Sequence, residues 1–348
     1  MDRKISTTAP KRTAVLLFNL GGPHKPEDVR GFLYNLFADR YIINLPFGLR
    51  QGVAALISSR RAPMARANYA LMGGGSPILK ETEAQRQALE TYISKNTQGM
   101  ETRVFTGMRY WHPFIAETVR EIEAYRSDQI VVLPLYPQFS STTTLSGFEA
   151  FKKAYRGKAK VHYVCCYAGN GHFIKAHADA VAAVLKRLSA PENYRILFSA
   201  HGLPETIVKR GDPYSEQVEA SVARIMAMLN TDVEHTICYQ SRVGPLKWIG
   251  PSTDDTIRQA GRDGKSVIVV PVAFVSEHIE TLVELDIEYG HLAREAGVAD
   301  YIRVPALGVN GDYIKALNDE VLKAIGTEAA IIGDHDCAAC HRFCPKRR

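Results

Sequence analysis

Short runs of β-branched residues alternate along the chain with segments of helical length, and this alternation constrains the fold most strongly. Such a pattern is typical of a parallel α/β sheet, in which helices connect successive strands. The runs predict strands at residues 14–19, 102–106, 129–134, 160–165, 195–200, 235–239, 266–271 and 301–304. Apolar periodicity predicts helices at 113–125, 174–188, 215–229, 277–294 and 312–324, and a further helix that begins near Ile78.

This number of strands favours two doubly wound halves over a single barrel. We therefore expect an α/β protein with two Rossmann-like domains, each a parallel sheet of roughly four strands flanked by helices. The predicted bounds are 13–155 for the N-terminal domain, 156–325 for the C-terminal domain and 326–348 for a cysteine-bearing tail. Ligands in such folds bind at the carboxyl ends of the strands.

Composition and charge narrow the class of protein. The chain has 348 residues, of which 46% are hydrophobic and 23% charged, as expected for a folded globular protein. Its longest apolar run, 267–275, is far shorter than the ~20 residues that a membrane-spanning helix needs. The first residues are polar and basic and contain no apolar core of an export signal, so we expect a cytoplasmic protein.

The net charge is +6, from 43 Lys and Arg against 37 Asp and Glu. Arg60, Arg61 and Arg66 lie near one another and predict contact with an anionic membrane surface or an acidic ligand. The chain has no nucleic-acid-binding motif and its charge is not concentrated in one block, so we expect no nucleic-acid partner.

His201 follows a predicted buried strand and is followed directly by Gly202. This places it on a turn at the edge of the sheet where ligands bind. A neutral imidazole there can accept a proton or bind a metal ion, although a loop histidine with a purely structural role is the alternative.

Glu280, Glu284 and Glu288 are spaced four residues apart, in a segment from Ser276 to Ala293 that contains no Lys or Arg. A helix would stack these carboxylates on one face, where like charges repel each other by a few tenths (~0.2–0.5) of a kcal/mol per pair. A solvated helix face would mix charges of both signs. The pattern instead indicates a path for a cation or for protons.

The tail carries Cys337, Cys340 and Cys344, a spacing that favours metal binding over a tail without a ligand. A fourth ligand must come from elsewhere, and the candidates are Cys165, Cys166, Cys238, His335 and His341. Four thiolates favour an iron–sulfur cluster, whereas three thiolates and a histidine favour structural zinc.

Motifs at 19–23, 73–77, 107–110, 135–138, 199–204, 210–214, 240–245, 248–251 and 271–289 together resemble the ferrochelatase family. The resemblance spans roughly residues 13–325 in the family's order. It implies the type II chelatase fold and the insertion of Fe²⁺ into protoporphyrin IX to give protohaem, the last step of haem biosynthesis.

The resemblance also assigns site residues. It implies that His201 is the catalytic histidine and accepts protons, that Glu280 is its partner near the substrate iron, and that Glu284 and Glu288 conduct iron or protons. The implied substrate-binding residues are Leu20, Tyr69, Ser76, Arg109, Tyr110, Trp248 and Phe274.

The tail resembles that of ferrochelatases that bind a [2Fe–2S] cluster. Ser141 stands where animal members have an internal cysteine ligand, so Cys165 or Cys166 is expected to join Cys337, Cys340 and Cys344. Cluster-containing relatives imply a homodimer. The apolar substrate implies peripheral contact with the inner face of the membrane.

Three competing hypotheses stay open. The first is a chelatase for coproporphyrin III, or for another tetrapyrrole or metal. The second is a non-catalytic porphyrin or haem carrier, and the third is an iron–sulfur sensor built on a chelatase scaffold. A carrier has no use for the acidic series or for His201, so both would then be dispensable.

Overall fold

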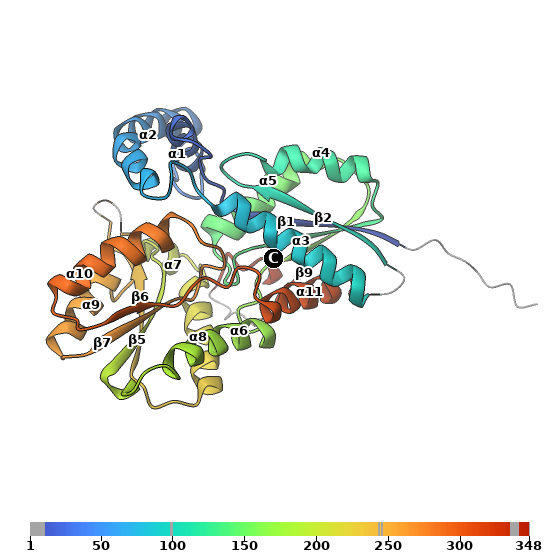
Figure 1. Ribbon diagram of the computed structural model, residues 1–348. Coiled ribbons are helices and arrows are strands. Elements are labelled where there is room, and N and C mark those ends of the chain that lie inside the picture. The colour runs from blue at the N-terminus through green and yellow to red at the C-terminus, as the bar shows by residue number, and fades with distance from the viewer. Residues whose placement is uncertain (1–10, 98–99, 243, 245, 335–340, 348) are drawn as a thin grey trace, which may run out of the picture.

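Two parallel sheets organise the protein, as the alternation of strands and helices predicts (Figure 1). The computed structural model describes residues 11–97, 100–242, 244, 246–334 and 341–347. Each sheet and the helices packed on it are called a unit here, N-terminal for the sheet that contains β1 and C-terminal for the sheet that contains β5.

The N-terminal sheet has the strand order β2-β1-β3-β4-β9 and the C-terminal sheet the order β6-β5-β7-β8. The strands of the N-terminal sheet are β1 (Lys11–Asn19), β2 (Met100–Met108), β3 (Gln129–Pro134), β4 (Lys160–Val164) and β9 (Ile331–Ile332). Those of the C-terminal sheet are β5 (Tyr194–His201), β6 (His235–Gln240), β7 (Ser266–Pro271) and β8 (Tyr301–Arg303). Every predicted strand is confirmed, and β9 is an additional one.

The register brings the ends of neighbouring strands together. Asn19 at the end of β1 is level with Met108 at the end of β2, and His201 at the end of β5 is level with Gln240 at the end of β6. The candidate residues that follow these strands therefore lie at the carboxyl edges of the two sheets, where ligand binding is expected.

Helices connect the strands. The predicted helices are found within a few residues of their limits, and five further α-helices among the described residues were not predicted. The α-helices are α1 (Val29–Phe37), α2 (Phe47–Ala70), α3 (Ile78–Asn96), α4 (Ile115–Tyr125), α5 (Ser146–Ala154), α6 (Gly171–Leu185), α7 (Glu205–Lys209), α8 (Tyr214–Leu229), α9 (Thr253–Arg262), α10 (Tyr289–Glu295) and α11 (Gly311–Ile325). Two π-helical segments occur, η2 (Ser141–Leu145) and η4 (Glu280–Glu288). Asn170 and Asn310 cap α6 and α11 by accepting the first free backbone N–H groups.

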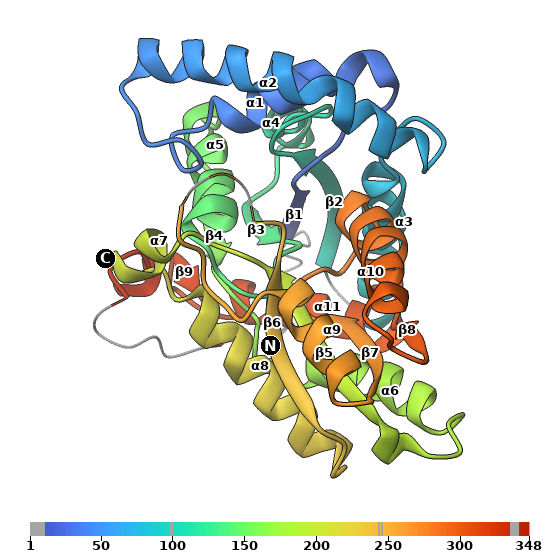
Figure 2. The same ribbon diagram turned by 90° about the vertical axis from the view of Figure 1, so that its left-hand side faces the viewer.

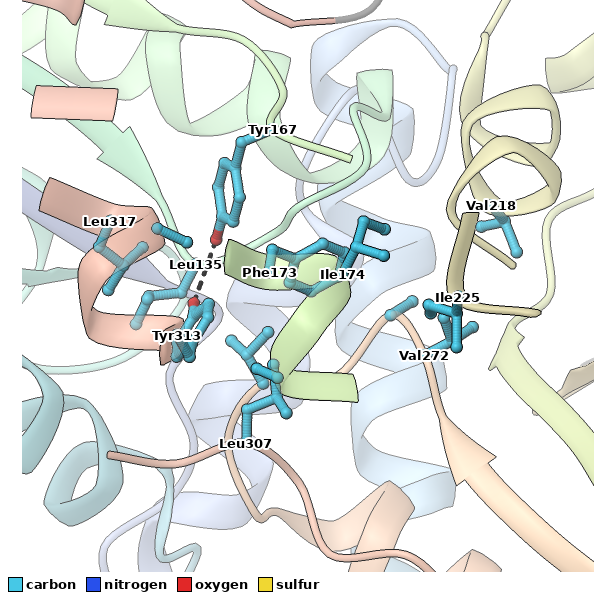
Figure 3. Packing of buried hydrophobic residues seen from close by; sticks show 14 of the residues in the cluster. Leu135, Tyr167, Phe173, Ile174, Val218, Ile225, Val272, Leu307, Tyr313 and Leu317 are labelled. Atoms are coloured by element: carbon cyan, nitrogen blue, oxygen red, sulfur yellow. Dashed lines mark hydrogen bonds between the residues drawn. The ribbon is translucent and has the colours of Figure 1, made fainter. Parts of the chain in front are cut away.

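A single hydrophobic cluster joins the two units. It includes Val131 of β3 and Ile268 of β7, both fully buried. Between the sheets, Phe173 of α6 packs edge-on against Tyr167 and Tyr313, and the two phenol groups are hydrogen-bonded over 3.1 Å (Figure 3). Continuous packing of this kind fixes the relative positions of the two sheet edges.

The last helix returns to the N-terminal unit. Although α11 follows β8 in the chain, it packs against α3, α6, β3 and β4, and β9 then pairs with β4 (Figure 1). The residue bounds given above for the two domains and the tail stay a prediction.

Helices α1 and α2 lie together along one side of the molecule, apart from both sheets (Figure 2). The C-terminal end of α2 carries Asn68 and Tyr69, which contact the η4 segment described below. No helix among the described residues is apolar over a length sufficient to span a bilayer.

Candidate active site

His201 and Glu280 form a close pair at the carboxyl edge of the C-terminal sheet. The Nδ1 atom of His201 lies 3.0 Å from Glu280 Oε2. Burial alone would lower the pKa of His201, but Glu280 outweighs burial and raises it. Burial alone would raise the pKa of Glu280, but His201 lowers it to about 2. The pair therefore favours a charged carboxylate beside an imidazole of increased basicity.

His278 approaches the same carboxylate oxygen, with its Nε2 atom 4.0 Å from Glu280 Oε2. Its Nδ1 atom is 3.0 Å from the carbonyl oxygen of Ser276, which holds the ring in place. Burial lowers the pKa of His278 despite the nearby carboxylate. The residue was not among those singled out from the sequence, although it belongs to the most specific motif.

The acidic series lies on η4, a π-helical part of the helix predicted for residues 277–294. The bond from the N–H of Tyr289 to the carbonyl of Glu284 spans five residues, as π-helical geometry requires. The three carboxylates of the series, Glu280, Glu284 and Glu288, reach three different sets of partners. The three carboxylates therefore have different surroundings, which their regular spacing in the sequence does not indicate.

Glu284 is held by four donors. The N–H and hydroxyl groups of Ser241 donate over 2.8 and 2.5 Å, and Gln240 Nε2 and the Tyr289 hydroxyl donate over 3.0 and 3.1 Å. Burial and then Glu280 raise the pKa of Glu284, although Ser241 and Gln240 act in the opposite direction. This carboxylate is fixed in orientation and lies within electrostatic range of His201.

Glu288, at the outer end of the series, accepts a 3.4 Å hydrogen bond from Asn68 of α2. The neighbouring Tyr69 is buried, and both burial and the charge of Glu280 raise its pKa. The C-terminal end of α2 therefore lies against η4 at the outer end of the acidic series.

The N-terminal unit contributes a cluster of polar residues to the site. Arg109 Nη2 lies 2.8 Å from Asp39 Oδ2 and its Nε donates to the Ser146 hydroxyl over 2.7 Å. Tyr110 is fully buried and donates its hydroxyl to the same Asp39 oxygen over 2.8 Å. These four residues, Asp39, Arg109, Tyr110 and Ser146, are called the Asp39 cluster, and a cavity of about 370 Å³ borders it.

Tyr136 lies within electrostatic range of both this cluster and the His201–Glu280 dyad. Burial raises the pKa of Tyr136, and the charges of both Arg109 and Glu280 act on it, so the phenol lies within range of both sides. Its buried hydroxyl has no hydrogen-bond partner among the described residues. The residue belongs to a motif of the sequence, but its place between the two units depends on tertiary structure.

The other predicted substrate-binding residues lie around the same region. Leu20 and Ile279 pack against the cluster that contains Tyr69 and Tyr110. The ring of Phe274 lies 4.8 Å from that of His278. Trp248 is so close to Gly202 that a Cβ added there would lie 3.2 Å from the indole ring, and one added at Gly22 would lie 2.5 Å from Ser76.

Cys165 and Cys166 are buried at the end of β4, with their sulfur atoms 3.6 Å apart. Cys344 is also buried, and it contributes to the raised pKa of Cys165 after Cys166 and burial. Cys337 and Cys340 lie outside the described residues. Within the described part of the chain, no three His, Cys, Asp or Glu side chains are placed to bind a metal ion.

Comparison with known proteins identifies the family of this chain. The sequence profile of the ferrochelatase family matches residues 12–325. The chain is 52% identical to the ferrochelatase of Caulobacter vibrioides over 341 residues, which cover 97% of this chain and 98% of the relative. It is 50% identical to the ferrochelatase of Phenylobacterium zucineum over 337 residues, with the same coverage.

The fold matches that of a solved tetrapyrrole chelatase. The sirohydrochlorin chelatase of Bacillus subtilis subspecies spizizenii, solved with cobalt, superposes with a TM-score of 0.53 at 12% identity. The match covers 91% of this chain and 97% of that protein, which at this identity supports the fold alone. The family profile and the two relatives show that this chain belongs to the ferrochelatase family, and the fold is compatible with it.

Proposed function

We propose that the protein inserts Fe²⁺ into protoporphyrin IX to give protohaem, with the His201–Glu280 pair as its proton acceptor. The chain is a ferrochelatase, an enzyme that inserts iron into a porphyrin. The observation that carries the proposed chemistry is the 3.0 Å contact between His201 and Glu280 at the edge of the C-terminal sheet.

Metal insertion requires that two pyrrole N–H protons leave the porphyrin and that the planar ring bends to expose its nitrogen lone pairs. A neutral His201 can accept such a proton, and Glu280 then stabilises the imidazolium that forms. Binding energy from the apolar face of the ring can offset the cost of bending. Among the described residues, Glu288 accepts only a long bond from Asn68, so its carboxylate is suited to conduct iron or protons, whereas Glu284 accepts four hydrogen bonds.

The reaction is tested by anaerobic turnover of the purified protein with Fe²⁺ and protoporphyrin IX, followed by haem absorbance. Coproporphyrin III is assayed in parallel. Haem formed from protoporphyrin supports the proposal. Activity with coproporphyrin III alone would identify a coproporphyrin ferrochelatase, and tight porphyrin binding without insertion of iron would indicate a carrier.

We also propose that the tail and β4 bind a [2Fe–2S] cluster, with Cys337, Cys340, Cys344 and one of Cys165 and Cys166 as ligands. The buried thiols fit this ligand set, because Cys344 and both β4 thiols share one region. Gly333 leads into the tail and passes so near that an added Cβ would lie 2.5 Å from the Cys165 sulfur. Such a cluster fixes the tail and can exchange single electrons.

One of the two cysteines that follow β4, Cys165 or Cys166, is the proposed fourth ligand. Its substitution by serine is expected to remove nearly all cluster absorbance and acid-labile sulfide, since a thiolate ligand is lost. Cys165→Ser and Cys166→Ser are compared by visible absorbance, and Cys238→Ser is the matched control because Cys238 is equally buried in the other sheet. If both β4 variants keep wild-type absorbance, the fourth ligand lies elsewhere.

We further propose that the enzyme is a cytoplasmic homodimer and that α2 lies on the inner face of the membrane. Large apolar side chains with more than half of their surface exposed lie along it and at its ends: Phe47, Leu49, Leu56, Met64 and Leu71. The helix also carries four arginines and no acidic residue. Apolar area and cationic charge together favour an anionic bilayer.

The double variant Arg60→Gln/Arg61→Gln is expected to bind anionic vesicles roughly thirtyfold more weakly, because each arginine near such a surface contributes about 1 kcal/mol. The measurement is co-sedimentation with phosphatidylglycerol vesicles at low salt. Arg258→Gln/Arg262→Gln on α9 changes the charge equally and should bind like the wild type. Equal binding by both double variants would exclude α2 as the contact.

A further inference from the structure

Asp212 is a buried carboxylate that the chemistry above does not use. Only 1% of its surface is exposed, and no described Lys, Arg or His side chain pairs with it. Burial raises its pKa, although several hydrogen bonds to it act in the opposite direction. Burying a carboxylate without a counter-ion costs free energy unless hydrogen bonds replace its lost hydration.

Those hydrogen bonds cross from one unit to the other. Asp212 precedes α8 of the C-terminal unit, yet its Oδ2 atom accepts from the N–H and hydroxyl of Ser141 over 2.7 and 2.6 Å. The Ser140 hydroxyl also donates to it, over 3.1 Å. Ser140 and Ser141 begin η2 of the N-terminal unit, so Asp212 anchors the start of that π-helical turn.

Both ends of this contact continue into the candidate active site. On the N-terminal side, η2 runs directly into α5, where Ser146 bonds Arg109 and Asp39, and the Thr142 carbonyl lies 3.5 Å from the Tyr110 hydroxyl. On the C-terminal side, the N–H of Tyr214 donates to Asp212 Oδ1 over 3.1 Å. Burial raises the pKa of the Tyr214 phenol and the backbone of His201 lowers it, so this buried phenol lies close to the His201 backbone.

We propose that Asp212 is a positioning residue that holds the Asp39 cluster in register with His201 and so fixes the shape in which the porphyrin is bent. The inference rests on the role proposed above for His201. Asp212 touches neither member of the dyad with its side chain, and it acts through Ser141 on one side and Tyr214 on the other. Close-packed protein interiors transmit small displacements, and a misplacement of about 1 Å is costly for catalysis.

Asp212→Ala is expected to lower kcat at least about tenfold, because small misplacements of catalytic groups are costly. The KM for porphyrin should change less than about threefold, since ground-state contacts remain. Out-of-plane vibrational bands of the bound porphyrin, measured by resonance Raman spectroscopy without metal, should weaken. Ser141→Ala removes one donor and keeps the backbone N–H, so it should change the same quantities less and serves if Asp212→Ala does not fold.

Thr118→Val is the matched control, because Thr118 is equally buried and its 2.7 Å bond to the Thr106 carbonyl stays within the N-terminal unit. It should keep wild-type kcat and Raman bands. Wild-type bands and kcat in folded Asp212→Ala, or equal losses in Thr118→Val, would overturn the proposal. The Raman bands test Asp212 even if His201→Ala shows that the proposed proton acceptor is wrong.

Discussion

His201→Ala is expected to lower kcat for iron insertion about a thousandfold while the protein stays folded, since a positioned general base contributes ~10²–10⁴-fold. The imidazole lies 3.0 Å from Glu280, and no other described basic side chain approaches that carboxylate as closely. The measurement is anaerobic haem formation at saturating Fe²⁺ and porphyrin. Porphyrin binding is followed in parallel by fluorescence quenching, and the affinity should change little because the ring is held mainly by apolar contacts.

The matched control is His235→Ala, which removes an exposed imidazole at the opposite end of β6 from the site. It should keep wild-type kcat. Circular dichroism and thermal unfolding of both variants separate lost chemistry from lost structure. A folded His201→Ala protein with wild-type kcat would refute the proposed proton acceptor and leave His278 as the next candidate, because it is the other imidazole within 4.0 Å of Glu280.

The strands could be predicted because buried parallel strands appear in the sequence as short, nearly continuous runs of β-branched residues. The run at residues 266–271, for instance, is fully buried as β7. β9 escaped prediction because two residues carry no periodicity and its pairing with β4 depends on the path of α11. The π-helical geometry of η4 could not be derived from spacing, since residues four apart share a face of an α-helix as well.

The candidate site was predictable where a residue directly follows a strand, as His201 does, because topology alone places it at the sheet edge. Other residues, which reach the site through long-range contacts and carry no local pattern, were missed. Asp39, for example, binds Arg109 across 70 residues of sequence, and Asp212 binds Ser141 across 71. No local pattern marks such a pair, and only tertiary packing brings its members together.

Glu280→Gln is expected to move the acid limb of the kcat–pH profile to lower pH. His201 must be neutral to accept a proton, so kcat rises as pH increases through its pKa. In the wild type, Glu280 outweighs burial and raises that pKa above the usual 6.5. With the anion removed, burial remains and the pKa falls. At pH values above this limb, kcat should fall about tenfold or more, because the carboxylate closest to His201 no longer stabilises the imidazolium.

The same variant has a defined effect on stability. The pKa of Glu280 is lowered from 4.5 to about 2, so its contribution is present above pH 4.5 and is lost as pH falls toward 2. The raised pKa of His201 gives a contribution that is present below pH 6.5 and is lost as pH rises through the folded value. The difference in Tm between wild type and Glu280→Gln, measured without iron, should therefore be largest between pH 4.5 and 6.5.

Glu288→Gln is the control, because it removes a carboxylate from the same π-helix whose contact is Asn68 and not His201. Its acid limb should stay at the wild-type pH, whatever its effect on the rate. If Glu280→Gln and Glu288→Gln shift the limb equally, the summed negative charge of η4 sets the basicity of His201. If neither shifts it, the limb reports a different group, and the 3.0 Å contact between His201 and Glu280 orients the imidazole without tuning it.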